Sequence, residues 1–216
     1  MTITEILLPL LKGDPQSRSA FSSHASQISS HLVGTPGLQL FWHGAVLFDA
    51  GNPVAPDSGR AALLIEWDTL SSFHAFYPHS PAFQAFGGIM KPYAARPDAP
   101  KLFQAVTSAK DTGSAPITQI IKARHGPDTE RLWTRLQTAL LSDEKNLDTV
   151  GKPVFAHALG VEEQEGAFLG TIGWKGLEDY SRTRSDETVQ GILGELKAGD
   201  DSALDLVVRL EKLQVE

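Results

Sequence analysis

Three histidines are the side chains of this sequence that best fit acid–base chemistry. His74 and His79 flank an aromatic pair at the end of an apolar, helix-forming segment, and His43 lies in a strand-like run. Imidazole titrates near neutral pH, so one of these residues could remove a proton from a phenol or an activated C–H group. The alternative for His74 and His79 is a pair of partly exposed histidines at a helix end, where a cation favours the helix dipole.

Strand alternation separates His43 from its neighbour Trp42. Successive side chains of a strand point to opposite faces, so one of the two faces the helices and the other faces the opposite side of the sheet. We expect His43 to act in binding or catalysis; the alternative is a hydrogen-bonded core or interface histidine. A pocket for an apolar ligand needs aromatic walls. The residues predicted to supply these walls are Trp42, Trp67, Phe73, Phe76, Tyr77, Phe83 and Phe86.

Glu66 and a histidine pair are the other groups that could do chemistry. Glu66 would be a base if it faced the pocket, because burial raises the pKa of a carboxyl group; otherwise it faces solvent or pairs with a cation. His24 and His31 share a helix face, but no third metal ligand lies at a predictable spacing. The sequence contains no HExxH, GxSxG or GxGxxG motif. We therefore expect neither a metal nor a cofactor.

The bulk composition excludes several classes of partner. The chain has 216 residues, 41% of them hydrophobic, a formal net charge of -7 and no cysteine. A negative chain without a lysine- or arginine-rich cluster is not expected to bind nucleic acid or an anionic membrane. It has no long apolar run and no basic, cleavable leader, and the lack of cysteine is typical of the cytosol. We expect a cytoplasmic protein with an aromatic or apolar small-molecule substrate.

The first half of the chain has the element order βαββαβ. Its first helix is predicted after Asp14 and Pro15, with an apolar face formed by Phe21, Ala25, Ile28 and Leu32. The segment GNPVAPDSGR is rich in turn-forming residues and makes the two middle strands a hairpin with a long loop. The predicted strands are Thr4–Leu11, Leu38–Phe48, Ala61–Trp67 and Lys101–Thr107, and the later helices are Leu70–Tyr77 and Ala82–Met90.

The second half repeats this order. Gly13 and Arg18 correspond to Gly126 and Arg131, and Trp67-Asp-Thr-Leu corresponds to Trp174-Lys-Gly-Leu once the shorter second hairpin loop is allowed for. Because Trp67 is matched in both halves, it is as well explained by packing as by catalysis. The predicted strands are Ile117–Ala123, Val154–Val161, Phe168–Trp174 and Leu204–Leu210, with helices at Asp128–Leu141 and from about Leu177 and Thr188.

This repeat predicts an α+β fold of two tandem ferredoxin-like βαββαβ units. The units are residues 1–108 and 117–216, with a linker at 109–116. A four-stranded antiparallel sheet with helices on one face leaves its other face bare. Packing the two sheets against each other covers both bare faces and gives a single-chain version of a dimeric α+β barrel. Such a chain would be a monomer or a weak homodimer.

The segment from Leu64 to Phe86 resembles the antibiotic biosynthesis monooxygenase (ABM) family and its dimeric α+β barrel relatives. In that family a strand ending in an aromatic residue, here Trp67, leads into a helix and then a Ser-Pro-x-aromatic turn, here Ser80-Pro-Ala-Phe. The resemblance implies a ligand site between the sheet and the helices of a unit, or at the barrel mouth. In haem-degrading relatives a Trp and a His act with an Asn on the first strand. Trp67 and His74 could stand in these places, but the first strand has no Asn, which weighs against haem.

Aromatic residues and histidines gather in the first half and charges in the second. Residues 1–108 hold twelve of seventeen aromatics and five of seven histidines, whereas residues 109–216 hold thirteen of nineteen Lys/Arg and nineteen of twenty-six Asp/Glu. We therefore expect the first half to bind the ligand and the second to act mainly as a scaffold. The resemblance implies a cofactor-independent enzyme of secondary metabolism that acts on an aromatic or polyketide-like molecule by oxygenation, cyclisation, isomerisation or decarboxylation. The alternative is a non-catalytic protein that binds a hydrophobic ligand, or a stress-response barrel.

Overall fold

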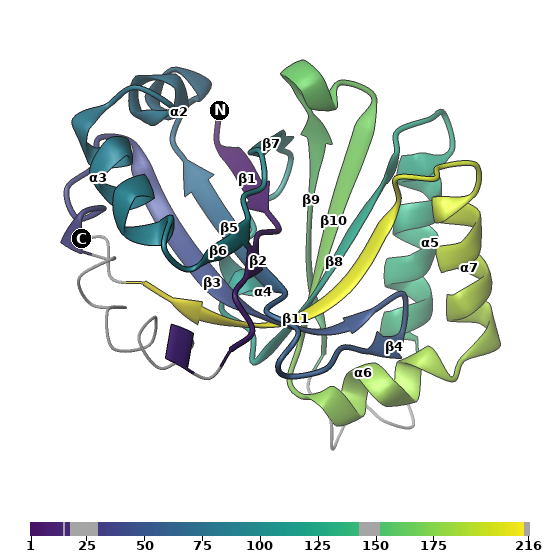
Figure 1. Cartoon of the computed structure of the whole chain (residues 1–216). Coiled ribbons are helices and arrows are strands. Elements are labelled where there is room, and N and C mark those ends of the chain that lie inside the picture. Colours follow the sequence, from purple (N-terminus) through teal and green to yellow (C-terminus); the bar gives the residue numbers. More distant parts are fainter. Residues whose placement is uncertain (15, 18–29, 143–151, 214–216) are drawn as a thin grey trace.

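Eight long strands and the helices outside them form the fold (Figure 1). The computed structural model describes residues 1–14, 16–17, 30–142 and 152–213, and the elements below are those of these ranges. The long strands are β1 (Ile3–Leu7), β3 (Leu38–Asp49), β5 (Ala61–Trp67), β7 (Lys101–Ala105), β8 (Ile117–Arg124), β9 (Val154–Gly160), β10 (Ala167–Trp174) and β11 (Leu204–Lys212). The short strands are β2 (Leu10–Leu11), β4 (Asn52–Pro53) and β6 (Ala94–Arg96). The helices are α2 (Leu70–Phe76), α3 (Pro81–Met90), α4 (Lys110–Gly113), α5 (Thr129–Leu141), α6 (Leu177–Arg184) and α7 (Glu187–Lys197), with a 3₁₀ turn η1 (Glu162–Gln164).

The long strands close into an antiparallel barrel. Their order is β11-β8-β10-β9-β7-β1-β5-β3, and β11 also pairs with β3, which closes the ring. The four strands of residues 1–108 have the order β7-β1-β5-β3 and those of residues 117–216 the order β11-β8-β10-β9. In each half the fourth strand therefore lies beside the first, and the third lies between the first and the second. The halves meet at two seams, β7 with β9 and β3 with β11.

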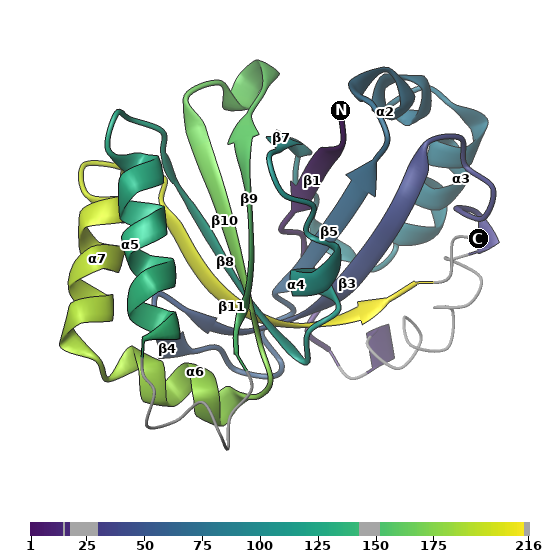
Figure 2. The same ribbon diagram turned by 180° about the vertical axis from the view of Figure 1, so that it is seen from behind.

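The two sheets are joined edge to edge, rather than stacked as separate layers. Their inner faces share one core inside the barrel, to which Trp42, Leu64, Phe103, Ile120 and Val208 contribute. Helices α2 and α3 cover the outer face of one half and α5 and α7 that of the other (Figures 1 and 2). Burial of apolar surface on both sides of the sheet is the main stabilising contribution, because each strand presents apolar side chains to the barrel core and to the helices.

Local sequence signals set the boundaries of the elements. The side chains of Thr69 and Ser80 cap α2 and α3. They accept hydrogen bonds from the backbone N–H groups of Ser72 and Phe83, respectively. The predicted first strand stops early, at Leu7, because Pro9 lacks an N–H group and the Leu8 N–H donates to Asp98 rather than to a neighbouring strand. The other predicted strands are confirmed to within two residues at each end, as are the described helices. Phe21, Ala25 and Ile28 of the predicted first helix lie outside the described residues, as do Pro15, Arg18 and His24.

The predicted linker plugs one mouth of the barrel, with Ala109, Thr112 and Gly113 buried and its other side exposed. Helix α4 lies between the strand ends of both halves, and its Thr112 side chain shares a 2.8 Å hydrogen bond with Thr171. Glu66 receives hydrogen bonds from Ser108 Oγ at 2.8 Å and Ala109 N at 2.6 Å. Glu66 therefore neither faces solvent nor pairs with a cation, contrary to the sequence-based expectation: it holds the start of the linker in place.

The described helices contain no segment that is both long and apolar enough to span a membrane.

Candidate functional site

A large cavity lies on the outer face of the β3–β11 seam. It has a volume of about 520 Å³ and its walls are mainly apolar, with Leu63, Leu47 and Met90 among them. The first-half hairpin loop, the end of β2 and the first residue of α6 complete the walls. We call it the seam cavity. The aromatic distribution predicted a cavity in the first half alone. Because β11 and α6 belong to residues 117–216, this cavity is instead built by both halves.

His43 lies in the wall of the seam cavity. Trp42 packs inside the barrel, so alternation turns His43 to the outer face. Its partner across the seam is Glu211 on β11, which also lines the cavity. Burial lowers the pKa of His43, and the charge of Glu211 opposes that shift. His43 is therefore mainly neutral at pH 7, the form of imidazole that can accept a proton.

The other predicted aromatic residues form a packed cluster between the first-half sheet and helices α2 and α3. Trp67 packs on Phe76 with ring centroids 5.1 Å apart, and Tyr77 stacks on Phe73 at 5.4 Å. Phe83 contacts both Phe76 and Tyr77, and Phe86 packs on Phe41 at 6.2 Å. None of the predicted aromatic residues is among those that line the seam cavity. The structure brings six of the seven together, but in a separate cluster from His43, and it places the seventh, Trp42, inside the barrel.

A carboxyl group missed by the sequence analysis lies inside this aromatic cluster. Glu5 on β1 is buried and accepts a 2.7 Å hydrogen bond from the indole Nε1 of Trp67. Burial raises the pKa of Glu5 to about 7, and the hydrogen bond from Trp67 only partly offsets that rise. The sequence signal was present, since Ile3-Thr-Glu-Ile-Leu places a carboxylate in a strand with apolar residues on both faces.

His74 and His79 lie on the surface, away from the seam cavity. His74 is exposed on α2 and its Nε2 is 2.7 Å from Glu162 Oε1 of η1. His79 is exposed in the turn between α2 and α3. The three histidines therefore do not form one site. The sequence could place each of them on an element, but not on a face of the barrel.

Haem does not fit at Trp67 and His74, where the family resemblance would place it. The rings of Phe73 and Phe76 already occupy the space over Trp67, at centroid distances of 6.0 and 5.1 Å. His74 already has a carboxylate partner at Nε2, one of the two ring nitrogens that can bind an iron. Glu5 stands on the first strand where an Asn was sought. Among the described residues there is also no cluster of three or more His, Cys, Asp or Glu side chains that could hold a metal ion.

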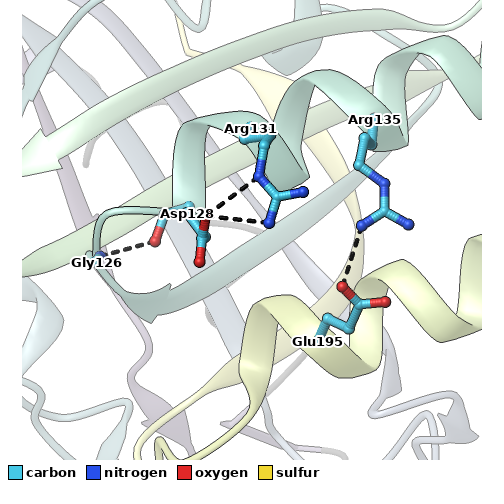
Figure 3. A network of polar contacts seen from close by, with 6 residues as sticks. Gly126, Asp128, Arg131, Arg135 and Glu195 are labelled. Carbon is cyan, nitrogen blue, oxygen red and sulfur yellow. Dashed lines mark hydrogen bonds and ion pairs between the residues drawn. The ribbon is translucent and has the colours of Figure 1, made fainter.

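The second half has a much smaller cavity, of about 70 Å³, at the position that corresponds to the Glu5–Trp67 pair. Trp174 lines it, with Gln119 on β8 and the Lys197–Asp205 ion pair at 2.6 Å. On the surface, α5 and α7 are joined by an ion pair between Arg135 and Glu195 at 3.1 Å (Figure 3). That pair is exposed, so it contributes little to stability.

Comparison with known proteins gives the fold a name. No known family profile and no curated protein matches the sequence. Solved structures match it along almost its full length. A "putative monooxygenase" from Lactobacillus acidophilus superposes with a TM-score of 0.55 at 12% identity, covering 99% of this chain and 94% of that one. The fold is that of the dimeric α+β barrel proteins.

Other α+β barrel proteins superpose equally well. An "anthrone oxidase-like protein" has a TM-score of 0.52 at 13% identity, covering 98% of this chain and 93% of that one. A "Putative Chlorite dismutase", TA0507, has a TM-score of 0.58 at 12% identity, covering 97% of this chain and 95% of that one. At such low identity the likeness establishes the α+β barrel fold and leaves the chemistry to be argued from the site.

Proposed function

We propose that the protein is a cofactor-independent enzyme that oxygenates an aromatic or polyketide-like small molecule in the seam cavity. The observation that carries this proposal is the position of His43, a neutral imidazole in the wall of an apolar cavity of about 520 Å³. A pocket with apolar walls and few polar groups suits a flat aromatic ligand. Relatives of the same fold described as monooxygenases and as an anthrone oxidase-like protein support this choice.

His43 would act as a general base on the substrate. It would take a proton from an activated CH2 group or its phenol tautomer, and Glu211 across the seam would stabilise the imidazolium that forms. The substrate carbanion then transfers electrons to O2 and forms a C–O bond with it. The resulting peroxide takes the proton back from His43 and becomes a hydroperoxide. Loss of the second C–H proton breaks the O–O bond and releases water. The balance is one CH2 group plus O2 giving one C=O group plus water.

One chain would be sufficient for this activity. Both seams of the barrel are made within the chain, and the seam cavity is lined from both halves, so no second subunit is needed to complete it. We also propose that the halves are diverged tandem copies. Their common strand order supports this origin, as does the pairing of Trp67 with Ile3 and of Trp174 with Ile117.

Oxygen uptake tests the proposal directly. With dithranol, an anthrone, in a buffer containing a metal chelator, we expect enzyme-dependent O2 consumption with formation of the anthraquinone. His43→Gln should lower the rate about 100-fold, because a general base contributes on the order of 10²–10⁴. The acidic limb of the kcat/KM profile should lie below the ordinary histidine pKa, since burial lowers the pKa of His43.

The control is the same substitution at His125, which lies outside the seam cavity and near Glu130. His125→Gln should retain the wild-type rate and melting temperature. If His74→Gln or His79→Gln abolishes activity and His43→Gln does not, the site is at the end of α2 and this proposal is wrong. Saturable dithranol binding without turnover would instead favour a ligand-binding protein. Turnover without O2 uptake would favour a redox-neutral enzyme.

A further inference from the structure

A second cavity, of about 450 Å³, opens at the barrel mouth opposite the linker. Helix α4 fills the mouth formed by the start of β8 and the end of β10. The cavity lies at the other ends of these strands, where β1 and β3 end and β7 and β11 begin. Its deep wall is apolar, with Leu8, Val46 and Leu206 from the barrel core. We call it the mouth cavity.

Positive charge exceeds negative charge around this opening. The charged residues of the lining are Arg60, Arg96, Lys101, Lys122, Asp49 and Asp98. Two of the four cations are neutralised, because Arg60 pairs with Asp49 at 2.7 Å and Lys101 pairs with Asp98 at 2.6 Å. This excess is unusual in a chain with a net charge of -7.

Lys122 and Arg96 are the two cations of the lining without a carboxylate partner in it. Lys122 is a partly buried residue whose ammonium group donates to the hydroxyl of Ser202 at 3.0 Å and to its carbonyl oxygen at 3.5 Å, both neutral partners. The carboxylate of Asp200 accepts from the Ser202 hydroxyl at 2.7 Å and interacts electrostatically with Lys122 without forming an ion pair with it. Arg96 is exposed at the rim. An ammonium group whose partners are neutral retains its capacity to bind an anion.

We infer that the mouth cavity binds an organic carboxylate with an apolar body. The carboxylate lies between Lys122 and Arg96, and the apolar part contacts Leu8, Val46 and Leu206 inside the mouth. This site is separate from the proposed catalytic site, although the two cavities share Pro9, Val46, Arg60 and Ala61 in a common wall.

A pair of isosteric probes tests this inference by calorimetry. 2-Naphthoate and 2-naphthamide have the same shape and differ in charge, so the wild-type protein should bind the carboxylate about tenfold more tightly than the amide at low salt. Lys122→Gln and Arg96→Gln should each lower the affinity for 2-naphthoate several-fold and leave that for 2-naphthamide unchanged. Added salt should weaken only the binding of the carboxylate.

Lys175→Gln is the matched control, because Lys175 is exposed and lies outside both cavities, and the substitution changes the net charge equally. Its affinity for 2-naphthoate should equal that of the wild type. Equal wild-type affinities for the two probes overturn the inference, as does full retention of 2-naphthoate binding in both mouth variants. Arg96→Gln changes an exposed side chain and keeps the test decisive should Lys122→Gln fold poorly. Oxygen uptake with dithranol is measured separately, so failure here does not depend on the outcome for His43.

Discussion

Replacing Glu5 by glutamine is expected to remove a pH dependence of stability worth roughly 3 kcal/mol. Burial raises the pKa of Glu5 from 4.5 to about 7, and one pKa unit corresponds to about 1.4 kcal/mol. Between these two pH values the folded state binds more protons than the unfolded state. The stabilisation that Glu5 contributes is therefore fully present below about pH 4.5. It is lost as the pH rises towards 7. Glu5→Gln keeps an acceptor for the Trp67 indole and carries no charge, so it should be more stable than wild type at pH 8.

Urea denaturation at pH 5, 6, 7 and 8 measures this difference. The gain in stability of Glu5→Gln over wild type should increase with pH and level off above pH 7. Glu163→Gln, an exposed carboxylate of η1, alters the net charge equally and should give a curve parallel to that of wild type. Parallel curves for Glu5→Gln and wild type would show that Glu5 is ionised in the folded protein.

Adding a single methyl group at Gly44 is expected to open the β3–β11 seam. A Cβ atom there would lie 1.8 Å from the carbonyl oxygen of Arg209 and 2.7 Å from its carbonyl carbon. These are backbone atoms of the paired strand, so they cannot move aside without breaking the pairing of Gly44 with Leu210. Gly44→Ala should therefore cost about 3 kcal/mol or more in unfolding free energy, and about 10 °C in melting temperature.

Gly87→Ala is the matched control for this prediction. Gly87 lies in α3, and a Cβ atom there would meet no heavy atom within 4 Å. Since glycine is about 0.5–1 kcal/mol worse than alanine inside a helix, this variant should melt slightly above wild type. Thermal unfolding followed by circular dichroism compares the two. If Gly44→Ala has the same melting temperature as the wild type, β3 and β11 are farther apart at Gly44 than described.

The sequence predicted the elements well because their signals are local. Periodicity and capping residues at Thr69 and Ser80 place helices within a few residues, and turn-forming segments delimit the strands. The early end of β1 was missed, although Pro9 carries the signal. Pairing across the seams was not predictable in the same way, because the register of β3 with β11 depends on residues far apart in the chain, Trp42 with Lys212 among them.

The candidate site was only partly predictable, for the same reason. Strand alternation showed that Trp42 and His43 face opposite ways, but only the closed barrel decides which face has a cavity. The aromatic residues around Trp67 were predicted as a group, but their rings pack against each other and do not line the cavity. The cavity is lined instead by β11 and the hairpin loop, among other segments. Glu5 and Lys122 were missed because the role of a charged residue in a strand depends on its burial and on its neighbours in the fold.

The β3–β11 seam also constrains how the protein is made. Strand β3 is synthesised early and keeps an edge free until β11, some 160 residues later, has left the ribosome. An unpaired strand edge is a template for pairing with other chains. Contacts between such distant segments also slow folding, since the loop must close before they form. The nascent chain therefore carries an exposed strand edge through most of its synthesis.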